Sequence, residues 1–198
     1  PDLEIAVGTL PSERIRVDIW DHVCLALDEG ERAASWVSEL LGGDYRLVRF
    51  DPAHRRESSR EWTGQETGLN RFSDGFPILL VGEKSLADLN GRLLSPIPMN
   101  RFRPNIVLEG LDPYDEDHLD TLTAGAVTLR VVKPCTRCEI TTTDQRTGAR
   151  AAEPLLTLAT YRANPRLQGG ITFGQNAIVS RGFGEMLAKP SQFEPGGP

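Results

Sequence analysis

Short segments that alternate apolar and polar residues, or that are wholly apolar, constrain the fold of this chain most. Alternation with a period of two is typical of a half-buried β-strand, and a short apolar run bounded by turn residues is typical of a buried one. Arg14–Trp20 has the first pattern and Ile78–Val81 has the second. Related signals predict further strands at residues 3–7, 23–27, 45–50, 106–108, 127–132, 139–143 and 177–179.

Three segments are predicted to be helices. Glu31–Leu41 places its apolar residues on one helical face and ends at a pair of glycines, which favour the end of a helix. Ser85 is expected to cap a helix that runs to Leu93. Glu153–Tyr161 is the third, with Pro154 tolerated in its first turn. The acidic residues 112–120 predict a turn or short helix.

Residues 51–72 are polar and predict a long loop. His54, Arg55 and Arg56 in this loop are candidates to contact an anion, although a solvated charge run is the more common role for such residues. Arg101, Arg103 and Asn105 precede a predicted strand and are suited to bind a phosphate or carboxylate, against the alternative of ordinary surface salt bridges.

Composition and charge narrow the class of protein. The 198 residues carry a formal net charge of -6, which disfavours nucleic acid polymers and anionic membranes as partners. No apolar run approaches the roughly 20 residues that span a bilayer. Three cysteines make no disulfide framework and suit a reducing compartment, so we expect a cytoplasmic protein in which Cys24 is buried.

The segment Lys133–Asp144 holds the residues with the most distinctive chemistry. Pro134 favours the end of a strand, which predicts that Cys135 and Cys138 lie in a turn at the mouth of a sheet, beside Arg137. A cation near a thiol favours the thiolate, which attacks electrophiles or binds metals.

Several functions of this cysteine pair are conceivable. A zinc site needs four ligands, a thioredoxin-like pair needs a helix after the first thiol, and a cysteine hydrolase needs a partnering histidine; the sequence supplies none of these locally. A single thiolate that binds a redox metal within a cofactor remains, and so does an inert pair of thiols. The residues alone do not choose between these two.

Seven motifs, spaced over about residues 12–180, resemble the MOSC family, the domain found at the C-terminus of molybdenum-cofactor sulfurases. The similarity is greatest to the branch of amidoxime-reducing proteins and their bacterial N-hydroxylaminopurine-reducing relatives. The motifs are Phe72–Pro77, Ser85–Asn90, Arg101–Asn105, Lys133–Cys138, Thr141–Thr142, Glu153–Leu155 and Phe173–Asn176.

The resemblance implies a mixed β fold with peripheral helices, a mostly antiparallel MOSC-type β-barrel. It implies that residues 1–30 are the end of an N-terminal β-barrel subdomain and that residues 31–188 form the MOSC domain. Residues 189–198, rich in proline and glycine, are expected to be a flexible tail.

The resemblance also implies a molybdenum–molybdopterin cofactor, with Cys138 as the metal ligand and catalytic residue and Cys135 as a neighbour. Family members are also described as binding pyridoxal phosphate. The implied activity is reduction of a small N-hydroxylated substrate, with electrons from a flavin or iron–sulfur donor protein. The alternative is a non-catalytic module that carries the cofactor or sulfur. Residues matching cofactor contacts are Arg103, Asn105, Thr136 and Arg137 and, further, Ser73, Asp74 and Asn176.

Overall fold

The computed structural model describes residues 2–185 and 193–196, which are arranged as two compact units. The first unit comprises residues 1–57 and 70–74, and the second comprises residues 58–69 and 75–198. The predicted division at residue 30 stays a prediction.

The first unit contains a three-stranded antiparallel sheet of β1 (Arg14–Ile19), β2 (His22–Asp28) and β3 (Val48–Phe50). The predicted strand at residues 3–7 is wrong, since this stretch has no regular structure. Helix α1 (Glu31–Leu41) has the predicted bounds and ends at Gly42, whose φ of 71° is left-handed. Asp28 is buried, and its hydrogen bonds with Arg46 hold the pKa of the Asp28 carboxyl below its usual value.

The predicted long loop at residues 51–72 is wrong, because it contains three short elements: β4 (Arg56–Glu57), α2 (Arg60–Thr63) and β5 (Leu69–Asn70). Within the second unit, Arg130 fastens α2 to the main sheet. Its Nη1 donates to the carbonyl oxygen of Thr63 at 3.1 Å and to the carboxylate of Glu66 at 2.9 Å. These tertiary contacts hold a helix too short to be stable alone.

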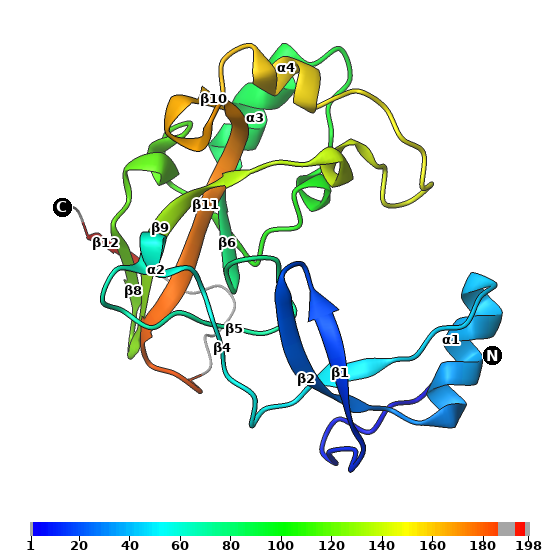
Figure 1. The fold of residues 1–198 in the computed structure, drawn as a ribbon. Coiled ribbons are helices and arrows are strands. Elements are labelled where there is room, and N and C mark those ends of the chain that lie inside the picture. The colour runs from blue at the N-terminus through cyan, green and yellow to red at the C-terminus, as the bar shows by residue number, and fades with distance from the viewer. Residues whose placement is uncertain (1, 186–192, 197–198) are drawn as a thin grey trace. The chain divides into compact units, whose positions relative to one another are not determined.

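The second unit is built on a curved, mostly antiparallel sheet. Long strand β11 lies between β9 and β6 (Figure 1), and only the pair β6–β7 is parallel among the strand pairs described. The expected fold, a mostly antiparallel MOSC-type barrel with peripheral helices, is confirmed. In sheet order the strands are β12 (Glu194–Gly196), β8 (Thr121–Ala124), β9 (Val127–Thr136), β11 (Gly170–Arg181), β6 (Ile78–Gly82) and β7 (Ile106–Leu108), with β10 (Ala163–Asn164) paired to β11.

Strands β8, β10 and β12 were not predicted, and β9 and β11 are longer than expected. Residues 194–196 of the expected flexible tail pair with β8. Residues 189–192 and 197–198 of that tail lie outside the described residues.

Apolar clusters cover both faces of this sheet. Leu80 and Val81 are neighbours in β6, so they point to opposite faces, and each belongs to a different cluster. The cluster around Val81 includes Leu89 from α3 (Glu83–Arg92) and Leu158 from α4 (Leu155–Ala159), which lie together in Figure 1.

Helix α3 begins differently from the prediction. Its cap is Gly82, and Ser85 lies inside the first turn. The Ser85 hydroxyl donates to the buried carboxylate of Glu116 at 2.6 Å, and the same carboxylate accepts from the backbone N–H of Gly82 at 3.0 Å. Glu116 comes from the 3₁₀-helix η2 (Asp115–His118), which confirms the short helix predicted at 112–120.

Gly174 is expected to be intolerant of a side chain. Its φ is +78°, and a Cβ there would lie 2.5 Å from the carbonyl oxygen of Leu80. Gly174→Ala should therefore lower the free energy of unfolding by about 2–3 kcal/mol, as measured by urea denaturation. The matched change Gly91→Ala, in α3 with open space around it, should be neutral or stabilise by up to about 1 kcal/mol. Equal effects of the two changes would contradict this assignment.

Candidate functional site

The cysteine segment differs from the predicted turn between two strands. Strand β9 continues through Cys135 and ends at Thr136, so Cys135 lies in the strand. The predicted strand at 139–143 is wrong, because Glu139–Thr142 form the 3₁₀-helix η3, and Cys138 is its N-terminal cap. Cys138 is exposed, Cys135 is half-buried, and Cys24 is buried in β2 as predicted. The structure thus presents one of the two thiols to solvent.

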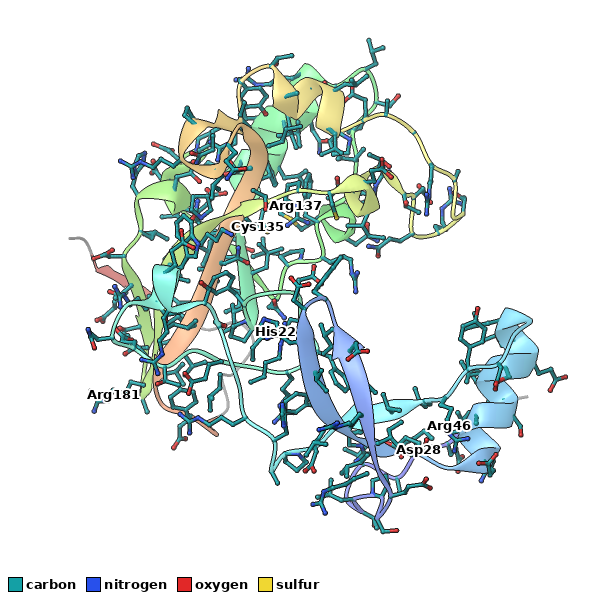
Figure 2. All side chains as sticks on the ribbon, viewed as in Figure 1. His22, Asp28, Arg46, Cys135, Arg137 and Arg181 are labelled. Atoms are coloured by element: carbon teal, nitrogen blue, oxygen red, sulfur yellow. The ribbon has the colours of Figure 1, made fainter. Side chains whose placement is uncertain are left out.

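Arg137 connects this segment to residues 101–105, which lie far away in the sequence. Its Nη2 donates to the carbonyl oxygen of Phe102 at 2.8 Å, and its guanidinium carbon lies 5.4 Å from the centre of the Phe102 ring. Its Nη1 donates to Cys135 Sγ at 3.0 Å (Figure 2). The buried Nε of Arg137 has no hydrogen-bond partner among the described residues. A buried donor without a partner is costly, so it favours an added acceptor.

The two arginines of the 101–105 segment have different roles. Arg101, in the 3₁₀-helix η1 (Met99–Arg101), is buried and donates to the carbonyl oxygens of Thr141 at 2.7 Å and Glu153 at 3.3 Å. Arg101 therefore holds η3 in place, and the prediction that it binds an anion is wrong. Arg103 is exposed with a left-handed φ of 55°, and its guanidinium has no partner within the described part of the chain.

Three further predicted site residues belong to the main sheet or adjoin it: Asn105 directly precedes β7, Thr136 ends β9, and Asn176 lies within β11. Asn105 is fixed to β6, since its Oδ1 accepts from the backbone N–H of Leu79 at 2.8 Å and its own N–H donates to the Leu79 carbonyl. Asn176 stands opposite Leu79 in the ladder between β11 and β6. Thr136 is exposed and stands opposite Thr172 of β11. The second unit thus places Asn105 and Asn176 beside Leu79, and Arg137 beside Phe102.

The remaining predicted site residues, Ser73 and Asp74, belong to the first unit. The Ser73 hydroxyl donates to Asn70 Oδ1 at 2.7 Å, and Asp74 accepts from the indole N–H of Trp20 at 3.2 Å. Arg56 is buried and donates to the carbonyl oxygens of this turn: Arg71 at 2.7 Å, Ser73 at 2.6 Å and Asp74 at 2.6 Å. Arg56 orders the turn, and its predicted role as an exposed anion contact is wrong. Arg55 pairs with Glu57.

The ligand chemistry around Cys138 limits what metal arrangement fits. Among residues 2–185 and 193–196, no three His, Cys, Asp or Glu side chains are grouped so as to hold a metal ion. A metal carried by a cofactor needs only one protein thiolate, and soft thiolates are suitable ligands for redox metals. The exposed Cys138 thiol, the free Arg103 guanidinium and the unpaired Nε of Arg137 fit an anionic cofactor with one metal–thiolate bond.

Sequence reasoning missed the residues that support this site. Phe102 and Phe173 are fully buried and stacked with their ring centres 4.2 Å apart, and Phe102 lies against Arg137. Each phenylalanine lies within a motif of the resemblance, which is the signal that could have identified them. No helix in the described ranges combines the length and apolar character of a membrane span.

Comparison with known proteins places the chain in a family. Residues 67–185 match the MOSC domain model. Human mitochondrial amidoxime-reducing component 1 is 37% identical over 86% of this chain and 51% of its own length, and the mouse protein of that name is 43% identical over 68% and 41%. Rice molybdenum cofactor sulfurase is 34% identical over 80% and 21%. The chain spans about half or less of these curated relatives. It belongs to the MOSC domain family.

Proposed function

We propose that this chain is a molybdenum-cofactor-dependent reductase of N-hydroxylated compounds, such as amidoximes and N-hydroxylated nucleobases. The observation that carries the proposal is the single exposed thiol of Cys138, next in sequence to a guanidinium whose Nε lacks a partner within the described residues. The names of the relatives, amidoxime-reducing component and molybdenum cofactor sulfurase, support a function related to this cofactor.

The residues have separate roles in the proposed site. Cys138 binds the metal through its thiolate. Arg103 and the Nε of Arg137 bind acceptor oxygens or nitrogens of the pterin, since guanidinium groups donate several hydrogen bonds in a fixed geometry. Asn105, Thr136 and Asn176 complete the contacts that the second unit supplies. Ser73 and Asp74, in the first unit, stay candidates from the resemblance alone. The cofactor, when bound, would supply two electrons for cleavage of the N–O bond, and with two protons taken from solvent the oxygen would leave as water.

The protein contributes side chains that are already held in position before the cofactor binds. Arg137 is held by the Phe102 carbonyl and ring, and Asn105 is held by both backbone groups of Leu79. Side chains fixed by such contacts bind a ligand without losing further rotational freedom. The proposed electron source is a flavin or iron–sulfur protein.

A second candidate is a module that binds the cofactor or sulfur without turnover. The observation that favours it is the match to rice molybdenum cofactor sulfurase, which covers 80% of this chain. The exposed Cys138 thiol suits either role.

The decisive experiment is metal, pterin and activity analysis of the chain produced in a host that synthesises the cofactor. The first candidate predicts about one molybdenum per chain and reduction of benzamidoxime with a chemical electron donor. Cofactor without turnover would favour the second candidate. Protein that contains neither molybdenum nor pterin would contradict the first candidate and would leave the second only as a carrier of sulfur.

A further inference from the structure

Lys133 is a half-buried cation that the proposed cofactor contacts do not include. It lies on β9 two residues before Cys135 and stands opposite Asn176 of β11. Residues that stand opposite each other in an antiparallel ladder have side chains on the same face, with their Cβ atoms about 5 Å apart. The Lys133 and Asn176 side chains are therefore neighbours.

Two aromatic rings hold the Lys133 ammonium in place. Its Nζ lies 5.0 Å from the centre of the Trp62 ring and 5.9 Å from that of Phe76. Trp62 belongs to α2, which Arg130 fastens to the sheet through Thr63 and Glu66. The Trp62 ring that contacts Lys133 is thus part of the folded structure of the second unit.

The ammonium lacks the partner that a half-buried charge usually has. No carboxylate of the described residues lies within ion-pair distance of Lys133. The rings attract its charge, but they offer no strong acceptor for its three N–H donors. The amide of Asn176 also makes no side-chain hydrogen bond within the described part of the chain. Two adjacent donor groups, one of them cationic, are suited to an oxyanion.

We propose that Lys133 and Asn176 form an oxyanion site that binds a phosphate monoester, the terminal phosphate of the bound cofactor. The source of the phosphate rests on the proposed function. Lys133 and Thr136 are three residues apart in β9, or about 10 Å along the strand. Side chains alternate along a strand, so Lys133 shares a face of β9 with Cys135. An elongated ligand with its metal at Cys138 and its phosphate at Lys133 would extend along that face.

The site itself is tested on cofactor-free protein by calorimetric titration with phenyl phosphate, so this result does not depend on reductase activity. Lys133→Met should weaken phenyl phosphate binding at least about tenfold, because it replaces the charged donor by an apolar side chain of similar length. Lys133→Arg should retain binding. The matched control is Lys84→Met, which removes a lysine already paired with Asp112 at 2.8 Å, and its affinity should equal that of the unchanged protein. Equal binding by Lys133→Met and Lys84→Met would overturn the site.

The chemical class and source of the anion are tested separately. Tighter, Lys133-dependent binding of benzoate than of phenyl phosphate would overturn the phosphate assignment in favour of a substrate carboxylate. In protein loaded with cofactor, Lys133→Met should lose more pterin on desalting than Lys84→Met. Equal retention would overturn the cofactor as the source. Phosphate binding that depends on Lys133, in a chain without reductase activity, would leave the site standing and remove only the proposed function.

Discussion

Cys138→Ala is expected to abolish benzamidoxime reduction and to reduce bound molybdenum to background. The proposed metal bond is made by this one thiolate, and no cluster of three His, Cys, Asp or Glu side chains among the described residues offers a substitute. Because Cys138 is exposed at the cap of η3, its replacement should leave stability nearly unchanged. Metal analysis, pterin analysis and turnover measured on one preparation, with circular dichroism as the folding check, test the prediction.

The matched control is Cys135→Ala, three residues away. Cys135 Sγ accepts a hydrogen bond from Arg137 Nη1, so its loss should reduce loading modestly and leave turnover per molybdenum within about a few fold. If instead Cys135→Ala loses the metal and Cys138→Ala keeps it, the ligand assignment is wrong.

Phe102→Ala is expected to lower the free energy of unfolding by about 3–5 kcal/mol, the typical cost of emptying a buried phenylalanine site. Phe102 is fully buried, stacks on Phe173 at 4.2 Å, and lies beneath the Arg137 guanidinium. The same change should therefore also reduce cofactor loading, since Arg137 loses the surface that orients it. Urea denaturation and pterin content measure the two effects.

Phe183→Ala provides the control for this change. Phe183 is 58% exposed, so the identical truncation there should alter stability by less than about 0.5 kcal/mol. A comparable loss of stability in both variants would show that Phe102 is not the packing centre of this cluster.

The sequence predicts a buried strand such as β6 well, but it places the end of β9 too early, at Val132 instead of Thr136. Pro134 has no N–H donor, and for this reason the sequence predicts a strand end there. Yet β8 pairs only with residues 127–130 of β9, so at Pro134 the strand has a neighbour only on the β11 side. Proline is tolerated at such an unpaired edge. The end of β9 depends on which strands pair with it, and the sequence of a single segment does not contain that information.

The incorrect strand at 139–143 has a local cause. Thr141 and Thr142 have high strand propensity, but their hydroxyls donate to the carbonyl oxygens of Cys138 at 3.0 Å and Glu139 at 2.7 Å. Such side-chain bonds to the backbone compete with strand pairing and stabilise a turn. The buried Arg101 guanidinium, which donates to the carbonyl of Thr141, adds a contact from a distant segment.

The sequence predicts which residues belong to the candidate site, but it predicts only part of what each residue does in the fold. The resemblance identified Cys138, Arg103, Asn105 and Arg137 as site residues, while their contributions stay predictions. Arg101 and Arg103 have the same side chain two positions apart, yet one is buried and the other exposed. The difference arises from the left-handed φ of Arg103 and from the carbonyl groups that surround Arg101. Both are properties of the folded chain.

The position of Arg137 links ligand binding to local order. The same guanidinium holds the Phe102 carbonyl and contacts Cys135, and its buried Nε–H has no partner among the described residues and is open to an anion. An anion that binds Arg137 contacts the same side chain that joins residues 99–105 to β9. Binding of the anion and opening of residues 99–105 are therefore thermodynamically coupled. Occupancy of the site therefore raises the free energy needed to detach this segment, and the ligand acts as a part of the fold.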